Sequence, residues 1–242
     1  LVAKEFLSWL AVPPAARWLD VGCGTGALTA MILAMASPSQ VDAIDASEGY
    51  VAYARGMTQD PRVRFQVADA RALPEPAEAR DAVVSGLVLN FVPEPARAVA
   101  EMARVARRGG TVAAYVWDYA GKMELMRHFW DVAVALDSSA RELDEGRRFP
   151  VCRPEALAAL FVDARLGEVE TRAIDVPTVF RDFDDYWSPF LGGQGPAPGY
   201  AMSLSEARRA ALRERIRASL PVGPDGSVHL VARAWAVRGR RP

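Results

Sequence analysis

The sequence predicts an α/β fold whose core is a doubly wound, mostly parallel sheet with helices on both faces and an antiparallel C-terminal strand. Two observations predict it. Short apolar runs alternate with helical patterns through the first half of the 242 residues, and such alternation is typical of parallel sheets joined by right-handed crossovers. The first apolar run also leads into a turn with three glycines, from Trp18 to Gly26, where such sheets bind ligands.

Composition limits the class of protein. Hydrophobic residues make up 51% of the chain, and the net charge of −1 gives no positive field for binding nucleic acid or an anionic membrane. The two cysteines, Cys23 and Cys152, have neither a zinc-type spacing nor the number of a disulfide framework, so we expect no metal site. No apolar run reaches the roughly 18 residues that span a bilayer, and no signal-peptide pattern is present. We therefore expect a cytoplasmic protein without membrane insertion.

The elements of the first half follow from residue patterns. Apolar residues recur at helical spacing from Leu1 to Leu10, and Pro13 and Pro14 end that helix. Because this pattern is already under way at Leu1, we expect a segment before it. Strands are expected at about 17–21, 41–45, 63–68, 81–87 and 111–117, and helices at about 27–35, 47–55 and 95–106. Arg107 to Gly110 is expected to close the last of these helices with a glycine stop.

The second half departs from this alternation. Helices are expected at about 123–137, 153–161 and 205–219, and strands with alternating polarity at about 168–180 and 227–237. We expect the last two strands to complete the sheet, with residues 181–222 inserted between them as a lid-like segment rich in glycine and proline. No internal repeat or second core is evident. The sequence therefore predicts a single domain over residues 1–242.

Two classes of cofactor compete for the glycine-rich turn. Gly22, Gly24 and Ala27 satisfy the spacing of dinucleotide-binding turns, which would make the protein a nicotinamide-dependent oxidoreductase. Asp20 favours a different ligand, because a carboxylate there would repel a pyrophosphate but suits the ammonium and sulfonium groups of S-adenosyl-L-methionine. Asp45 and Asp69 are expected at the carboxyl ends of the second and third strands, on the same edge of the sheet.

These residues resemble a known family. Leu19-Asp20-Val21-Gly22-Cys23-Gly24-Thr25-Gly26 resembles motif I of the class I S-adenosylmethionine-dependent methyltransferases, which have a Rossmann-like fold. Glu101 to Gly110 is similar to the segment before strand five in the small-molecule, "type 11" branch that includes quinone C-methyltransferases. The resemblance covers about residues 15–117 and implies that Asp45 holds both ribose hydroxyls, that Asp69 bonds the adenine amino group and that the Ala70 amide reads the ring. The cofactor-binding residues expected from the sheet edge and the resemblance together are Asp20, Gly22, Cys23, Gly24, Gly26, Asp45, Ala46, Ser47, Asp69, Ala70, Ser85 and Leu87.

The methyl acceptor is expected to be a small hydrophobic or aromatic molecule. Methyl transfer is an in-line displacement at an activated carbon, so positioning and exclusion of water supply most of the rate. If a general base is used, the candidates are His128 and Tyr115. The expected acceptor pocket is lined by Trp117, Tyr119, Phe129, Tyr186, Trp187 and Phe190. The alternative for these aromatic residues is an ordinary core, and for His128 a solvent-facing or packing role.

The leading interpretation is thus an S-adenosyl-L-methionine-dependent methyltransferase for a small molecule. A first alternative is a binding or regulatory protein that holds the cofactor without turnover. A second is the nicotinamide-dependent oxidoreductase. The oligomeric state and the acceptor atom, whether oxygen, nitrogen or carbon, are left open by the sequence.

Overall fold

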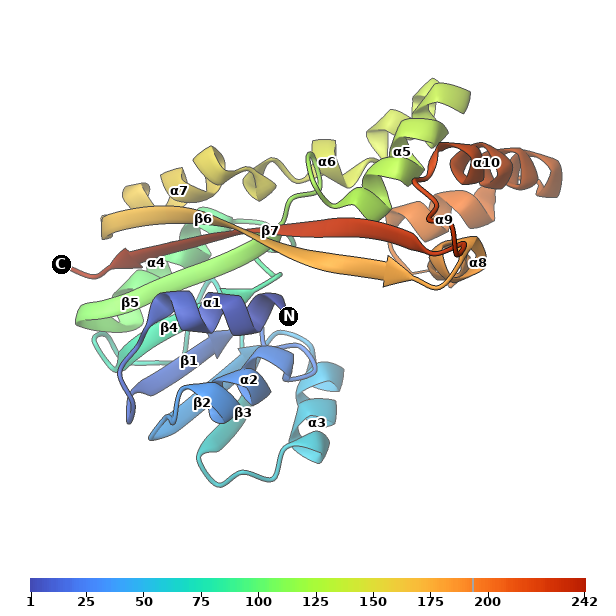
Figure 1. Ribbon diagram of the computed structural model, residues 1–242. Helices are drawn as coiled ribbons and strands as arrows, with labels where there is room; N and C mark the ends of the chain where they lie inside the picture. The colour runs from blue at the N-terminus through green and yellow to red at the C-terminus, as the bar shows by residue number, and fades with distance from the viewer. Residues whose placement is uncertain (193) are drawn as a thin grey trace. The chain divides into compact units, whose positions relative to one another are not determined.

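The computed structural model describes residues 1–192 and 194–242 as a seven-stranded sheet with helices around it (Figure 1). Gly193, in the glycine-rich part of the expected lid, lies outside the described residues. The strands are β1 (Arg17–Val21), β2 (Gln40–Asp45), β3 (Val63–Val67), β4 (Arg80–Gly86), β5 (Ala106–Trp117), β6 (Gly167–Phe180) and β7 (Val228–Arg240). The α-helices are α1 (Val2–Leu10), α2 (Ala27–Met35), α3 (Glu48–Met57), α4 (Pro95–Val105), α5 (Glu124–Leu136), α6 (Glu145–Arg148), α7 (Pro154–Asp163), α8 (Phe183–Trp187), α9 (Pro196–Ser203) and α10 (Glu206–Ser219). Short 3-10 helices lie at Ser138–Glu142, Pro150–Cys152 and Ser188–Leu191.

The strand order β3-β2-β1-β4-β5-β7-β6 confirms the predicted doubly wound sheet. The pairs β2–β3, β1–β2, β1–β4 and β4–β5 are parallel. β7 is antiparallel to β5, since the Gly109 amide donates to the Arg241 carbonyl whereas the Asp118 amide donates to the Arg233 carbonyl. The order reverses beside β1, so the carboxyl ends of β1 and β4 define the switch point where such sheets bind ligands.

The inner strands are nearly continuously buried because both faces of a parallel sheet are covered. In β1 every residue after Arg17 is buried, and β2 buries Val41 to Ile44 without a break. The edge strand β3 buries only Phe65 fully. This gradient in burial distinguishes the strands at the centre of the sheet, which carry the glycine-rich turn, from the strand at its edge.

The predicted glycine stop at Arg107 to Gly110 is wrong. α4 ends at Val105 and β5 begins directly at Ala106. Arg80 of β4 pairs with Ala106, and Ala82 pairs with Thr111, so the residues between Ala106 and Thr111 form a bulge in β5. Gly109 lies in this bulge with φ +70°. Such extra residues bend and twist a strand, and glycine supplies the backbone conformation they need.

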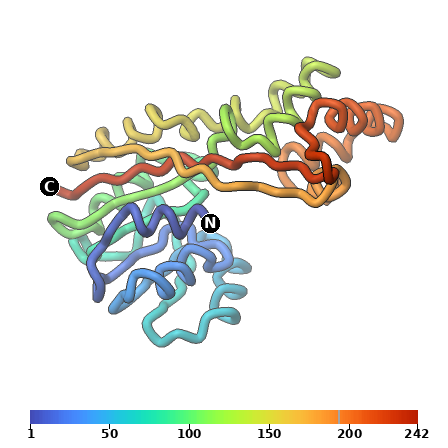
Figure 2. Tube along the Cα trace, in the orientation of Figure 1, coloured from blue at the N-terminus to red at the C-terminus, as the bar shows by residue number. Residues whose placement is uncertain are grey.

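The chain divides into two compact units. The first unit contains Leu1–Val116, Arg153–Ile174 and Trp235–Pro242, and the second contains Trp117–Cys152 and Asp175–Ala234. Two boundaries between the units fall within β6 and β7, the pair of long extended segments that run side by side in the trace (Figure 2). The described part of residues 181–222 lies in the second unit together with α5, and a single domain over residues 1–242 stays a prediction.

The second unit has a hydrophobic core of its own, which was not expected from the sequence. Phe129 and Trp130 of α5 are completely buried, and the Phe129 ring stacks on Phe190 with ring centroids 4.5 Å apart. Tyr186 of α8 is also completely buried, and Leu212 and Ile216 of α10 complete the packing. The segment between β6 and β7 is therefore a packed part of this unit, and its role as a lid stays a prediction.

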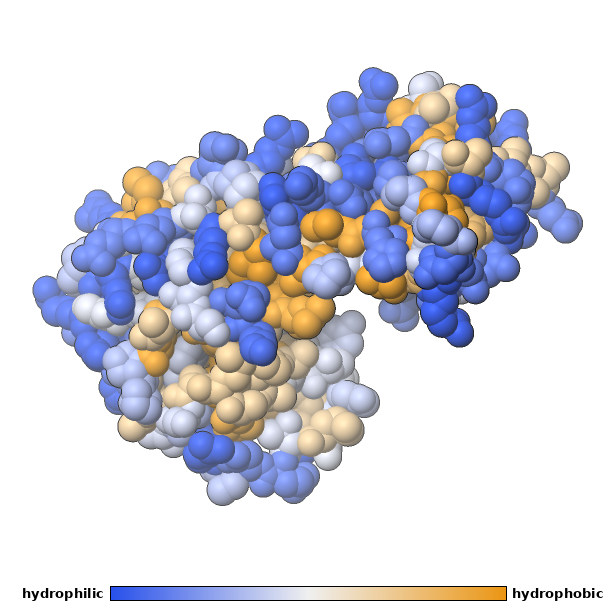
Figure 3. Space-filling model, in the orientation of Figure 1, coloured by the Kyte–Doolittle hydropathy of each residue, from blue (hydrophilic) through white to orange (hydrophobic). Residues whose placement is uncertain are grey.

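Hydrophilic side chains cover most of the visible surface of each unit, while apolar side chains gather over α1 (Figure 3). Leu1, at the start of α1, is 79% exposed. Within residues 1–192 and 194–242, no helix has both the length and the apolar character needed to cross a membrane.

Candidate cofactor site

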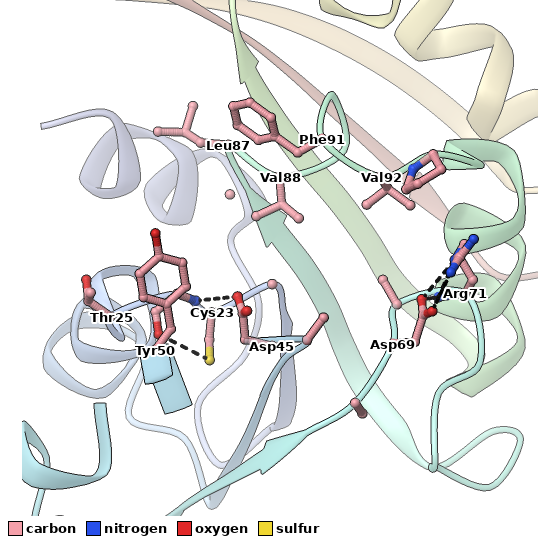
Figure 4. A pocket seen from close by; sticks show the side chains of 17 residues that line it. Cys23, Thr25, Asp45, Tyr50, Asp69, Arg71, Leu87, Val88, Phe91 and Val92 are labelled. Carbon is pink, nitrogen blue, oxygen red and sulfur yellow. Dashed lines mark hydrogen bonds and ion pairs between the residues drawn. The ribbon is translucent and has the colours of Figure 1, made fainter. Parts of the chain in front are cut away.

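A cavity of about 720 Å³ opens in the first unit at the carboxyl ends of β1, β2 and β4. Its lining comes from Tyr50 of α3 and from five short segments: Gly22 to Thr25, Asp45 with Ala46, Ala68 to Arg71, Gly86 to Val88, and Phe91 to Pro93. Leu87, Val88, Phe91 and Val92 lie along one side, and Asp45, Tyr50 and Asp69 lie along the other (Figure 4). The site thus has one mainly apolar wall and one wall that carries carboxylates.

The glycine-rich turn has conformations that only glycine adopts readily. Gly22, Gly24 and Gly26 have φ values of +76°, +53° and +90°. A Cβ atom at Gly22 would lie 2.5 Å from Cγ1 of Val88, so a larger residue there would push into the opposite wall. The amides of Gly22 and Cys23 both donate to the Ile44 carbonyl at 2.8 Å, which fixes the turn against β2. The absence of side chains therefore leaves backbone atoms exposed to the cavity.

Asp45, at the end of β2, joins three parts of the site. Its Oδ2 accepts a hydrogen bond from the Gly24 amide at 2.9 Å, and its Oδ1 accepts one from the Ser47 amide at 2.8 Å. Ser47 in turn caps α3, because its hydroxyl accepts a hydrogen bond from the Tyr50 amide. A carboxylate has about four acceptor positions, so about two remain on Asp45 for the hydroxyls of a ligand.

Asp69 carries an ion pair at the other end of the same wall. Its two carboxylate oxygens accept hydrogen bonds from the Arg71 guanidinium, the shortest being 2.7 Å from Nη2 to Oδ2. These bonds lower the pKa of Asp69 to about 2, so the carboxylate is ionised at neutral pH. Arg71 also donates to Glu94 at 3.0 Å.

Asp20 lies behind the cavity. It is completely buried, its Oδ2 accepts a hydrogen bond from the Thr29 hydroxyl at 2.7 Å, and its Oδ1 has no hydrogen-bond partner among the described residues. Burial raises its pKa to about 7. Neither Asp20 nor Gly26, Ser47 or Ser85 lines the cavity, although the sequence predicted all four as cofactor-binding residues. Cofactor contact by these four residues stays a prediction.

The other predicted cofactor residues do line the cavity. They are Gly22, Cys23, Gly24, Asp45, Ala46, Asp69, Ala70 and Leu87. Leu87 has φ +63°, a strained conformation that is typical of functional sites. Burial raises the pKa of the Cys23 thiol, so it is not an activated nucleophile.

Sequence reasoning missed several lining residues, above all Tyr50, Arg71, Val88 and Phe91. Tyr50 and Phe91 are 53% and 64% exposed, so neither belongs to the core. The available signal was the apolar run from Leu87 to Val92, which lies between a strand and a helix where a polar loop is usual. No pattern in the sequence identified Arg71.

The candidate acceptor residues lie almost entirely in the second unit. Phe129, Tyr186, Trp187 and Phe190 are at most 5% exposed and belong to its core. Trp117 and Tyr119 are half-buried, and the Tyr119 ring lies 5.7 Å from that of Phe149. Contact with an acceptor therefore stays a prediction for all six.

The two candidate bases have different settings. His128 of α5, in the second unit, is half-buried and does not line the cofactor cavity. Tyr115 of β5, in the first unit, packs edge-on against Phe6 with its hydroxyl above Gly86, where a Cβ atom would lie 2.6 Å from the oxygen. Burial raises the pKa of Tyr115, so its hydroxyl is neutral and could donate, but not abstract, a proton at neutral pH.

Comparisons with known proteins agree with this geometry. Residues 19–114, which contain the glycine-rich turn and the acids Asp20, Asp45 and Asp69, match the family model described as "Methyltransferase domain". The chain carries a class I methyltransferase domain. The matched segment, residues 19–114, is of the type 11 branch, and S-adenosyl-L-methionine is the cofactor of such methyltransferases.

Two curated relatives have names that specify a reaction. A malonyl-[acyl-carrier protein] O-methyltransferase of Methylococcus capsulatus is 33% identical over 42% of this chain and 37% of its own length. A 2-methyl-6-phytyl-1,4-hydroquinone methyltransferase of Synechocystis is 29% identical over 76% of this chain and 57% of its own length. The chain therefore spans about half the length of the curated relatives it matches.

Solved structures confirm the fold over the whole chain. A crystal structure of a protein from Bacillus halodurans aligns with a TM-score of 0.66, covering 99% of this chain and 98% of its own, at 16% identity. At this identity the likeness shows the fold alone, because one fold supports many functions.

Proposed function

We propose that this protein transfers a methyl group from S-adenosyl-L-methionine to a small hydrophobic or aromatic acceptor by in-line displacement. The observation that carries the proposal is the cavity formed by the glycine-rich turn, Asp45 and Asp69, within a segment that matches the methyltransferase family. The same match favours methyl transfer over the nicotinamide-dependent oxidoreductase considered from the sequence.

The residues of the cavity fit this cofactor. The volume of about 720 Å³ lies within the range of pockets for small ligands. Asp45 keeps about two acceptor positions, which is the number that the two hydroxyls of a ribose require. Asp69 is ionised at neutral pH, so its free acceptor position can accept a charge-assisted hydrogen bond from an amino group. Gly22 to Gly26 present backbone where a side chain would keep a ligand away.

Methyl transfer requires the protein mainly to position the cofactor and the acceptor. When bound, the cofactor supplies a methyl carbon on a positively charged sulfur, which an acceptor can attack without further activation. The contribution of this chain is then to orient the ligand and to exclude water. Val88, Phe91 and Val92 line the cavity with apolar surface that would keep water from the reacting atoms.

The class of acceptor rests on composition and on relatives. The names of two relatives specify 2-methyl-6-phytyl-1,4-hydroquinone and malonyl-[acyl-carrier protein], and neither is a nucleic acid. The aromatic residues of the second unit remain the predicted acceptor contacts, with Trp117 and Tyr119 favoured because the other four are buried in its core.

Calorimetry with S-adenosylhomocysteine tests the cofactor site without a need for the acceptor. We expect the wild-type protein to bind, and Asp45→Ala to bind at least about a hundredfold more weakly, because two charge-assisted hydrogen bonds and the support of the Gly24 amide are lost. Asp60→Ala is the matched control, since Asp60 lies outside the cavity. Unchanged binding by Asp45→Ala would place the ribose elsewhere.

A methyl-transfer screen tests the acceptor class. The screen follows formation of S-adenosylhomocysteine with hydroquinones, phenolic acids and aliphatic carboxylic acids, and with peptides and RNA as counter-substrates. We expect turnover with a member of the small-molecule group only. Turnover with peptide or RNA alone would refute the proposed acceptor, and binding without turnover on any acceptor would favour a regulatory role.

A further inference from the structure

Arg71 joins the two walls of the cavity. It lines the cavity beside Asp69, and its Nη1 donates a hydrogen bond to Glu94 at 3.0 Å. Its backbone carbonyl also accepts a hydrogen bond from Nε of Arg97 at 3.0 Å. Glu94 directly follows Pro93, the last lining residue of the apolar wall, and is the N-cap of α4. One residue thus ties the loop after β3 to the start of α4.

The same guanidinium restricts what Asp69 can bind. Oδ1 of Asp69 accepts from the amide and Nε of Arg71, and Oδ2 accepts from Nη2 and Nε (Figure 4). These bonds take about three of the four acceptor positions of the carboxylate and leave about one. The free position suits a single N–H donor. A carbonyl oxygen placed there would face another acceptor, which leaves both oxygens unpaired and repelling each other.

We propose that Arg71 is a positioning residue that orients Asp69, so that the cavity selects adenine over a base with a carbonyl at the same position. This inference rests on the proposed function, in which Asp69 faces the base of the cofactor.

A second aspartate–arginine pair in the chain has the same contacts but lies outside the cavity, so it serves as a control. Asp60 and Arg62 repeat the spacing and the contacts of Asp69 and Arg71: the Asp60 oxygens accept from the amide, Nε and Nη2 of Arg62, the last at 2.7 Å. The Asp60 pair does not line the cavity. Because exposed ion pairs contribute little to stability, removal of either arginine should leave the fold intact. The two pairs therefore separate an effect on binding from an effect on local structure.

The experiment compares Arg71→Met, Arg71→Lys and the control Arg62→Met by calorimetry. The probes are S-adenosylhomocysteine and its analogue in which hypoxanthine replaces adenine. We expect Arg71→Met to bind S-adenosylhomocysteine about tenfold more weakly, the effect of about one hydrogen bond to a charged group. Arg71→Lys should lose less affinity, because it keeps the charge but not the bidentate contact. Arg62→Met should bind as the wild type does.

The analogue gives the decisive readout. The wild-type protein should bind S-adenosylhomocysteine more tightly than the hypoxanthine analogue. Arg71→Met should lose affinity for S-adenosylhomocysteine but little for the analogue, so the ratio of the two affinities should be smaller in the variant. Equal affinities of Arg71→Met and wild type for S-adenosylhomocysteine would overturn the inference. So would an equal loss for both ligands. Failure of the wild-type protein to bind S-adenosylhomocysteine would overturn the proposed function, and this inference with it.

Discussion

At the scale of single residues, the three acids of the predicted site differ in their hydrogen-bond partners and in their burial. Asp45 is engaged by two backbone amides, Asp69 is paired with Arg71, and Asp20 is buried with one oxygen unpartnered. The sequence placed Asp45 and Asp69 at the ends of expected strands and Asp20 two residues before the first glycine, but it could not rank the three acids by burial. Burial depends on how α2 packs over β1, where Thr29 meets Asp20, and this contact is not visible in a pattern of spacing.

The state of Asp20 predicts a dependence of stability on pH. Burial raises the pKa of Asp20 from its ordinary value of 3.8 to about 7 in the folded protein, so between these pH values the folded state holds a proton that the unfolded state has released. Stability from this group is therefore fully present below pH 3.8 and is lost as pH rises to about 7. The free energy of unfolding falls by about 4 kcal/mol at most over this range, because a tenfold change in proton affinity corresponds to about 1.36 kcal/mol.

Asp20→Asn removes this titration while it keeps an oxygen that can accept from Thr29. We expect urea unfolding to show a smaller fall in stability from pH 5 to pH 8 for Asp20→Asn than for the wild type, with the variant the more stable at pH 8. Parallel curves for the two proteins would show that Asp20 is ionised when folded.

At the scale of elements, the sequence predicted those strands and helices whose pattern is set locally. The strand β1 and the turn after it follow from an apolar run ended by glycines, and the parallel pairing of the first five strands follows from their alternation with helices. The bulge at Arg107 to Gly110 could not be predicted in this way. Two glycines after a helix indicate a stop, but here the pairing of β4 with β5 determines the conformation.

The glycine-rich turn predicts two substitutions with different outcomes. Gly22→Ala places a Cβ atom 2.5 Å from Val88 at a positive φ, so it should lower both stability and S-adenosylhomocysteine affinity. Gly24→Ala meets no atom within 4 Å, so its cost should be the backbone strain of about 1–2 kcal/mol. Urea unfolding of both variants checks the expectation that Gly22→Ala is less stable than Gly24→Ala. A Gly22→Ala protein as stable as Gly24→Ala would show that Val88 moves away freely.

At the scale of the whole molecule, two cores support different parts of the chain. Every residue that lines the cofactor cavity belongs to the first unit, whereas four of the six aromatic residues expected around an acceptor lie in the core of the second. Aromatic residues at helical spacing are common to cores and to ligand pockets, so the sequence could not decide between them. The stacked rings of Phe129 and Phe190 show that packing accounts for at least these two.

This division predicts that stability and cofactor binding can be separated by matched substitutions. Phe129→Ala empties a fully buried position in the second unit and should cost about 3–5 kcal/mol of its stability. Affinity for S-adenosylhomocysteine, measured at 10 °C where the variant is folded, should stay at the wild-type value.

Phe65→Ala is the matched variant in the first unit, where the Phe65 ring packs 3.7 Å from the position of a Cβ at Gly26. It should weaken binding as well as stability, because it removes support from beneath the glycine-rich turn. Equal losses of affinity in the two variants would show that the cavity depends on both cores.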